Sequence, residues 1–181
     1  MGQMGFYYNW ENCIGCKACQ IACKDKNDLE VGVLFRRVYD FEGGKYPNPY
    51  IEHISISCNH CKDPKCVQNC PTGAMYKRTE DGLVLHDDSK CIGCRMCVWS
   101  CPYGAPQYIE ETGKVAKCTG CADLLEKGEE PACVASCVMR AIEFGDIDEL
   151  RKKYGEKADI EYLPDSSITH PSITIRMKER R

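Results

Sequence analysis

Sixteen cysteines in this 181-residue chain fall into four groups of four, and this pattern constrains the fold more than any other feature. Every group opens with C-x2-C and closes with C-x3-C, and only the gap between its second and third members varies. The sequence therefore contains a fourfold internal repeat with an insertion in one copy. The groups are Cys13, Cys16, Cys19 and Cys23; Cys58, Cys61, Cys66 and Cys70; Cys91, Cys94, Cys97 and Cys101; and Cys118, Cys121, Cys133 and Cys137.

Composition suggests that the cysteines hold the fold together. The mean hydropathy is −0.44 and aromatic residues make up 9% of the chain, so burial of apolar side chains alone would give a thin core. The 24 Lys and Arg residues nearly balance the 27 Asp and Glu residues. No basic face stands out, and nucleic acid is not expected as a partner.

Three chemistries compete for the thiols. Disulfides suit an even cysteine count in a small secreted protein, but no secretion signal is present, and pairs three residues apart make poor long-range links. Structural zinc takes two cysteine pairs separated by a loop, and the fourth group, taken by itself, could form such a site. The first and third groups fit zinc poorly, because they place three thiols within seven residues.

Iron–sulfur clusters fit all four groups. C-x2-C-x2-C wraps a short loop around a cubane, and a fourth cysteine in C-x3-C-P ligates the other cluster of a pair. Pro71 and Pro102 follow the last cysteines of the second and third groups, whereas Lys24 and Val138 follow those of the first and fourth. Four complete groups with no spare thiol predict four [4Fe–4S] clusters.

The prolines also pair the groups. Groups two and three form one ferredoxin-like unit, and groups one and four form another that encloses it. We therefore predict an α+β fold of two ferredoxin-like 2[4Fe–4S] units, one inserted in the other, with extended loops and a C-terminal tail. The predicted domains are an outer unit (residues 1–30 plus 112–155), a β-hairpin insertion (31–57), an inner unit (58–111) and an extended tail (156–181).

The segments between the groups carry weaker signals. Two strands are expected between the first two groups, joined at Gly43–Gly44 and Pro47/Pro49, and one short strand is expected at residues 82–87. The stretches "CPTGAMYKR" and "CPYGAPQYI" each predict a turn followed by an extended piece. The segment "DIDELRKKYG" predicts a helix, with acids at its start, bases at its end and Gly155 as the C-cap.

Four oxidised clusters would add roughly −8 to the charge of the protein. Lys17, Lys90, Arg95 and Lys117 lie beside the ligands and are candidates for offsetting this charge, with a solvated side chain as the alternative for each. His60 lies between two cysteines, but sixteen thiols already suffice for four cubanes. We interpret it as a structural or solvent-facing imidazole.

No stretch approaches the roughly 18 apolar residues needed to span a bilayer, and the N-terminus has neither a twin-arginine pair nor an apolar segment. No direct membrane insertion is expected. Clusters are assembled in the cytoplasm. The expected location is the cytoplasm, or the membrane or periplasm as part of a complex exported on a partner's signal.

Several stretches are familiar, among them "CIGCKACQIACKD", "FRRVYDFEGG", "SISCNHCKDPKCVQNCPTGAM", "CIGCRMCVWSCPYGAPQY" and "IDELRKKYG". The chain resembles the iron–sulfur subunits of the dimethyl sulfoxide reductase family of molybdopterin oxidoreductases. The resemblance implies a non-catalytic electron-transfer subunit between a molybdopterin catalytic subunit, with molybdenum or tungsten, and a membrane quinol-oxidising anchor or other donor.

The resemblance also implies which cysteines share a cluster. Cluster 1 lies nearest the catalytic subunit and cluster 4 nearest the membrane partner. The implied ligand sets are Cys13, Cys16, Cys19 and Cys137 for cluster 1; Cys118, Cys121, Cys133 and Cys23 for cluster 2; Cys58, Cys61, Cys66 and Cys101 for cluster 3; and Cys91, Cys94, Cys97 and Cys70 for cluster 4.

Two function classes thus remain at the level of sequence. The first is a four-cluster electron-transfer subunit of dimethyl sulfoxide reductase type, with subunits of formate dehydrogenase or hydrogenlyase, of polysulfide, thiosulfate or tetrathionate reductase, or of an aromatic dehydroxylase as alternatives. The second is a zinc-binding scaffold. No nucleotide-binding glycine motif and no catalytic constellation is found, so no catalytic residue is assigned.

Overall fold

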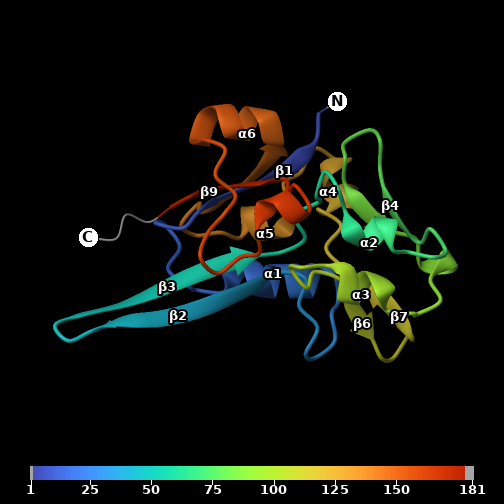
Figure 1. The fold of residues 1–181 in the computed structure, drawn as a ribbon, viewed down its shortest axis with the longest axis horizontal. Helices are drawn as coiled ribbons and strands as arrows, with labels where there is room; N and C mark the ends of the chain where they lie inside the picture. The colour runs from blue at the N-terminus through green and yellow to red at the C-terminus, as the bar shows by residue number, and fades with distance from the viewer. Residues whose placement is uncertain (1, 178–181) are drawn as a thin grey trace.

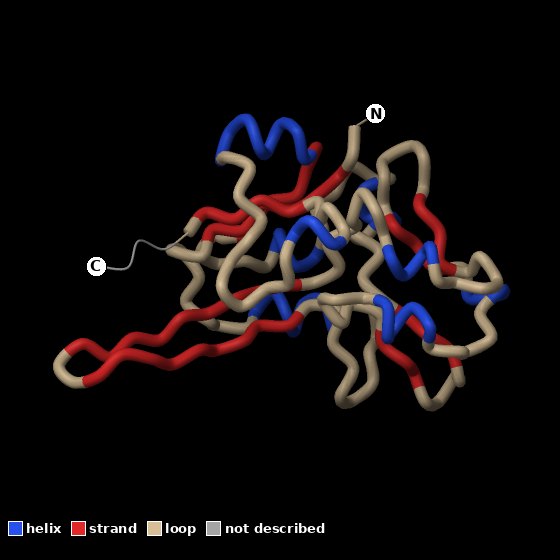
Figure 2. Tube along the Cα trace, viewed as in Figure 1, coloured by secondary structure: helices blue, strands red, loops and turns tan. Residues whose placement is uncertain are grey.

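Short helices and strands connected by long loops make up the structure, a computed structural model that describes residues 2–177 (Figures 1 and 2). None of these elements exceeds nine residues, because the cysteine loops interrupt the chain so often. The elements are β1 (Met4–Asn9), α1 (Ala18–Lys26), β2 (Arg37–Lys45), β3 (Asn48–Ile56), α2 (Lys65–Gln68), β4 (Met75–Lys77), β5 (Val84–His86), η1 (Asp88–Lys90), α3 (Met96–Ser100), β6 (Gln107–Ile109), β7 (Lys114–Ala116), α4 (Ala122–Leu125), α5 (Ala132–Ala135), β8 (Ile142–Asp146), α6 (Ile147–Tyr154), η2 (Ser166–Ile168) and β9 (Ile173–Arg176).

One three-stranded sheet brings together the beginning and the end of the chain. Its order is β8-β1-β9, with β8 antiparallel and β9 parallel to the central β1. We expected only an extended tail after residue 155, and the structure corrects this expectation. Ile173 and Ile175 in β9 are 3% and 2% exposed, so this segment is part of the core.

The two strands expected after the first cysteine group form the longest hairpin, which projects from the body at the left of Figure 1. The turn is at Tyr46–Pro47, between Lys45 and its partner Asn48. Of the predicted junction, Pro47 does lie in the turn, whereas Gly43 and Gly44 lie within β2 and Pro49 lies within β3. Gly43 pairs with Tyr50, whose ring occupies the space that a side chain at Gly43 would need.

Two shorter hairpins follow the cysteine-proline pairs. β4 pairs with β5 and β6 pairs with β7, both antiparallel. The expected turn and extended piece after each proline are confirmed at β4 and β6, and the strand expected at residues 82–87 is β5. The β6–β7 hairpin spans residues 107–116, so the predicted boundary between residues 111 and 112 runs through it.

Helix α6 matches its sequence signals. The Asp146 side chain accepts hydrogen bonds from the backbone N–H groups of Asp148 and Glu149, which caps the first turn. Gly155, at φ 92°, ends the helix in a conformation that favours glycine. The helix lies beside the central sheet (Figure 1). Its residues Ile147 and Leu150 are buried.

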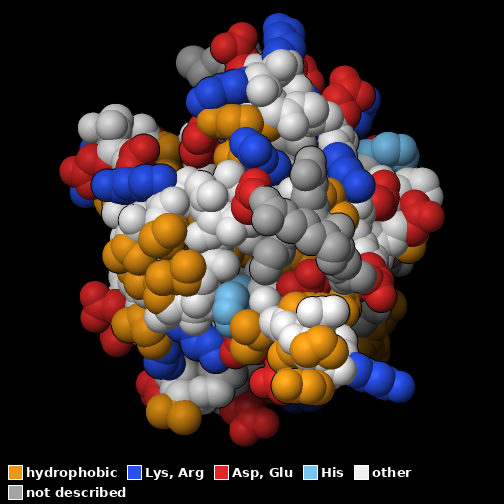
Figure 3. Space-filling model, turned by 90° about the vertical axis from the view of Figure 1, so that its left-hand side faces the viewer, with side chains coloured by type: hydrophobic (Ala, Val, Ile, Leu, Met, Phe, Trp, Pro, Cys, Tyr) orange, Lys and Arg blue, Asp and Glu red, His pale blue; other side chains and the backbone are white. Residues whose placement is uncertain are grey.

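The core is divided into three clusters of buried side chains, and cysteines belong to each. The first joins the central sheet to α1 and α5 and includes Phe6 and Trp10. Smaller clusters surround Phe35 and Met75. Charged groups of both signs are interspersed on the face shown in Figure 3, where apolar side chains form separate patches. The fold is mixed α/β, and its interior is organised around the thiols.

Candidate iron–sulfur sites

The fourfold sequence repeat is also a repeat of backbone shape. The residue before the second cysteine of each group has a positive φ, at Gly15 (68°), His60 (43°), Gly93 (67°) and Gly120 (68°). Three of the four positions are glycine, which adopts this conformation without steric cost. Turns of this kind point successive backbone N–H groups into one concavity, a shape that binds anions. Each loop is therefore suited to an anionic cluster.

The first and fourth groups lie together. Burial raises the pKa of Cys23 to about 12, with further contributions from the thiols of Cys118, Cys133 and Cys121. The last cysteine of group one thus lies among three cysteines of group four.

The last cysteine of group four shows the reciprocal arrangement. The pKa of Cys19 is raised first by burial and then by the thiols of Cys137 and Cys13. The last cysteine of group four therefore lies among members of group one. Helices α1 and α5, which carry several of these cysteines, pack against each other.

The second and third groups exchange their last cysteines in the same way. One pocket is lined by Cys101 of the third group together with three cysteines of the second, Cys58, Cys61 and Cys66. Another pocket is lined by Cys70 of the second group and by three of the third, Cys91, Cys94 and Cys97. The structure thus brings thiols of the second and third groups together in two sets, and it brings thiols of the first and fourth groups close to one another.

The environment of these thiols favours a cationic metal centre. Burial, with neighbouring thiols, raises the pKa of Cys66 and Cys61 to about 12 and of Cys97 and Cys121 to about 11. Ionised thiolates there need positive charge, which iron would supply while releasing the protons. Backbone N–H groups already donate to three sulfurs, from Met75 to Cys70, from Gly120 to Cys118 and from Ala141 to Cys137.

Some buried polar atoms around the pockets lack a partner within the protein. Asn59 lines the pocket of Cys58, Cys61, Cys66 and Cys101, and both polar atoms of its side chain are unpaired. Nε2 of His86 is unpaired beside Cys70, Cys91, Cys94 and Cys97. A buried donor without an acceptor is costly, and the sulfides of a cluster are acceptors that would satisfy it. The residues present therefore fit an iron–sulfur cluster.

The competing chemistries fit less well. All sixteen cysteines are free thiols, so no disulfide joins any of them. Within residues 2–177, no three His, Cys, Asp or Glu side chains are grouped closely enough to hold a single metal ion. Zinc draws four sulfurs to about 2.3 Å from one centre. In a cubane each cysteine sulfur binds a different iron, so the four sulfurs lie farther apart than they do around a single zinc ion.

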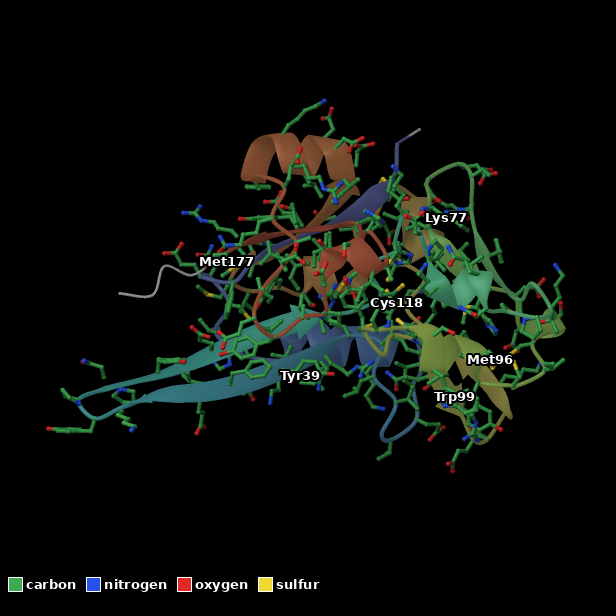
Figure 4. The ribbon with its side chains drawn as sticks, viewed as in Figure 1. Tyr39, Lys77, Met96, Trp99, Cys118 and Met177 are labelled. Atoms are coloured by element: carbon green, nitrogen blue, oxygen red, sulfur yellow. The ribbon has the colours of Figure 1, made fainter. Side chains whose placement is uncertain are left out.

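Two thiols are more exposed than the rest. Cys16 and Cys94 are exposed, while every other cysteine is buried or half-buried. Apolar side chains are exposed beside both thiols. Figure 4 shows Met96 and Trp99 on α3, with Cys118 in the middle of the molecule. The exposed apolar residues in the cysteine loops are Ile14, Ile21, Val138 and Met139 in groups one and four, and Ile92, Met96 and Trp99 in group three.

The candidate charged residues beside the ligands differ in burial. Lys17, Lys90 and Arg95 are exposed, whereas Lys117 is 2% exposed. His60 is fully buried and accepts a hydrogen bond from the backbone N–H of Val84, so the structural interpretation of this residue is confirmed. Sequence reasoning missed Arg36, which is 3% exposed among the thiols. Its own segment carries no signal for this burial, because the neighbouring Arg37 looks the same in the sequence.

Comparison with known proteins agrees with this geometry. Residues 50–147 match the model of a 4Fe-4S dicluster domain, and residues 10–30 match that of a 4Fe-4S binding domain. All sixteen cysteines lie within these two ranges. The B subunit of the anaerobic dimethyl sulfoxide reductase of Escherichia coli (strain K12) is 50% identical over 96% of this chain and 88% of its own length.

This protein belongs to the iron–sulfur subunits of the dimethyl sulfoxide reductase family. The corresponding subunit of Haemophilus influenzae is 46% identical, over 97% of this chain and 90% of its own. A formate dehydrogenase iron-sulfur subunit of Wolinella succinogenes is 37% identical, over 80% and 82%. The predicted family is therefore confirmed. No helix within residues 2–177 is both long and apolar enough to cross a membrane.

Proposed function

We propose that this chain carries electrons through four [4Fe–4S] clusters, each held by three cysteines of one group and one of another. The proposed ligands are Cys13, Cys16, Cys19 and Cys137 (cluster 1); Cys118, Cys121, Cys133 and Cys23 (cluster 2); Cys58, Cys61, Cys66 and Cys101 (cluster 3); and Cys91, Cys94, Cys97 and Cys70 (cluster 4). Each cluster, when bound, would accept and release one electron.

The exchange of last cysteines supports the nested arrangement of two ferredoxin-like units. Groups one and four share thiol neighbours, and so do groups two and three. We retain residues 1–30 with 112–155 as the outer unit, 31–57 as the hairpin insertion and 58–111 as the inner unit. The β6–β7 hairpin, at residues 107–116, then connects the two units.

The order of the clusters is supported by the thiols that neighbour one another. The thiol of Cys118, assigned to cluster 2, raises the pKa of Cys58, assigned to cluster 3, although burial is the larger cause. The exposed Cys16 and Cys94 belong to clusters 1 and 4. Electrons would thus enter and leave at the ends of the series, while clusters 2 and 3 stay away from solvent.

As a member of this family the chain is an electron-transfer subunit of an oxidoreductase complex and is not itself catalytic. Its catalytic partner would be a molybdopterin subunit facing cluster 1. A quinol-oxidising membrane subunit, or another donor, would face cluster 4. The sequence identities favour the dimethyl sulfoxide reductase type over the formate dehydrogenase and thiosulfate reductase types.

The observation that carries the proposal is that two pockets are each lined by three cysteines of one group and one of another, while thiols of groups one and four neighbour one another. The test is iron and sulfide analysis of the anaerobically purified complex, with redox titration followed by electron paramagnetic resonance. We expect about sixteen irons per chain and four one-electron steps. Zinc at about one per four cysteines, without sulfide, would favour the scaffold instead.

A further inference from the structure

Two cations lie in the interior of the protein. Among residues 2–177, Arg36 and Lys117 are the Lys and Arg residues that are buried, at 3% and 2% exposed. A buried cation is costly unless a negative group compensates it. The surroundings of each residue should therefore show what its charge compensates.

Arg36 is held by neutral groups. Its guanidinium donates hydrogen bonds to Oγ of Ser55 at 3.1 Å and to Oγ of Ser57 at 2.8 Å, and its Cζ lies 4.8 Å from the centre of the Phe6 ring. These contacts orient the guanidinium but do not neutralise it.

The groups that Arg36 can compensate are thiols. Burial alone would lower the pKa of Arg36, yet four neighbouring thiols raise it above its usual value. One of them, Cys19, is assigned to cluster 1, and the other three, Cys133, Cys118 and Cys23, are assigned to cluster 2. Oγ of Ser55, which accepts from Arg36, also lies 3.4 Å from Sγ of Cys19. This contact places the guanidinium beside a thiol assigned to cluster 1, and the other three thiols place it at the junction with cluster 2.

Lys117 shows the same arrangement one junction further along. Its Nζ donates to two backbone carbonyls, that of Val84 and, at 2.8 Å, that of Cys118. It also lines the pocket of the cluster 3 ligands, together with Cys58 and Cys66. Lys117 thus lies between Cys118 of cluster 2 and the thiols of cluster 3.

The set of thiols assigned to cluster 4 is different. Lys90 and Arg95 adjoin it in sequence, but Lys90 is 59% exposed and pairs with Asp87 at 3.0 Å, and exposed Arg95 stacks on the ring of Tyr108. In the part of the chain that the structure describes, no buried Lys or Arg accompanies these four thiols.

We propose that Arg36 and Lys117 are fixed counter-charges at the two junctions, and that they raise the reduction potentials of the clusters that they separate. This inference rests on the ligand sets of the proposed function. Reduction adds a negative charge, and a cation fixed nearby in a poorly polarisable interior stabilises the reduced form. It would also weaken the repulsion between two reduced neighbours. Surface cations have less effect, because water and salt screen them.

The test is Lys117→Gln in the complete complex. Glutamine keeps a side-chain hydrogen-bond donor and removes the charge. The matched control is Lys90→Gln, since Lys90 also directly precedes the first cysteine of its group but is exposed. We expect Lys117→Gln to lower the reduction equilibrium constants of clusters 2 and 3 at least tenfold, or about 59 mV for one electron. Cluster 4 and the control should be unchanged, and Lys117→Arg should restore the potentials.

Arg36→Gln gives an independent test on a different part of the fold. It should lower the potentials of clusters 1 and 2 and leave cluster 4 unchanged. Unaltered potentials with full iron content would overturn the inference, as would an equal shift of all four clusters. Too few irons in the wild-type protein would instead contradict the proposed function.

A variant that fails to load iron is also informative. If both glutamine variants lose clusters, Lys117→Arg and Arg36→Lys decide the matter, because both retain the charge. Full iron content with potentials near those of the wild type would support the inference. Loss of iron there too would overturn it, since side-chain shape rather than charge would then be what the site requires.

Discussion

The imidazole Nε2 of His60 lies 4.0 Å from Sγ of Cys118, although the two residues belong to different cysteine groups. Nδ1 of His60 accepts the backbone N–H of Val84 at 3.0 Å, which places the ring proton on Nε2, toward the sulfur. Burial, and then the charge of Lys117, lower the pKa of His60. The ring is therefore a neutral donor directed at Sγ of Cys118, which is assigned to cluster 2, and it comes from the loop assigned to cluster 3.

Replacing His60 should disturb both stability and cluster 2. His60→Leu leaves the buried N–H of Val84 without an acceptor, which should destabilise the protein by about 1–3 kcal/mol. It also removes the donor to Cys118, so the potential of cluster 2 should fall. Thermal unfolding and redox titration measure the two effects. His170→Leu is the control, because His170 also has a positive φ but its side chain is 60% exposed. Equal effects of both variants would contradict the assigned role.

Exchange of the last cysteines can be tested by serine variants. Cys137→Ser should change the same paramagnetic signal as Cys13→Ser, because we assign both residues to cluster 1. Cys23→Ser should instead change the signal that Cys118→Ser changes. Redox-titrated spectra of the four variants, with iron content, provide the measurement. A Cys137→Ser variant that altered the signal sensitive to Cys118 would refute this pairing.

The sequence predicted the local features that depend on residues near each other in the chain. Helix α6 followed from Asp146, its charge pattern and Gly155. The turns after Pro71 and Pro102 followed from proline and glycine. The ligand sets, predicted from the cysteine pattern and the resemblance together, remain a prediction.

Features that depend on distant contacts were missed. β9 has only four residues, and its pairing with β1 joins segments about as far apart as the chain allows. From the sequence, Arg36 would be expected at the surface, because the thiols that neighbour it in the fold come from other segments of the chain. The four lysines and arginines beside the ligands could not be told apart from the sequence. Only the fold distinguishes Lys117, whose buried Nζ donates to the backbone carbonyls of Val84 and Cys118.

The contribution of β9 to stability can be measured directly. Ile175 is 2% exposed in a strand that closes one side of the central sheet. Ile175→Ala should cost about 2–5 kcal/mol, from lost burial and the resulting cavity. Ile168→Ala, at a residue that is 45% exposed, is the control and should cost much less. Similar unfolding temperatures for the two variants, both with full clusters, would show that β9 is peripheral.

Docking of the electron donor should depend on the apolar surface beside cluster 4. Trp99 lies on α3 (Figure 4) and is 74% exposed, so most of its surface is accessible to solvent. Trp99→Asp should therefore change the stability of the isolated chain by no more than about 0.5 kcal/mol. An aromatic residue at the centre of an interface commonly contributes about 2 kcal/mol or more to binding, equivalent to about thirtyfold in affinity. The variant should retain its clusters but lose reduction by quinol in the complex.

The reciprocal control is Val138→Asp, at a residue that is 67% exposed beside Cys137, which is assigned to cluster 1. This control should spare reduction by quinol and weaken binding of the catalytic subunit. If both variants weakened the same partner, the two ends of the electron path would not be the separate docking surfaces proposed for them.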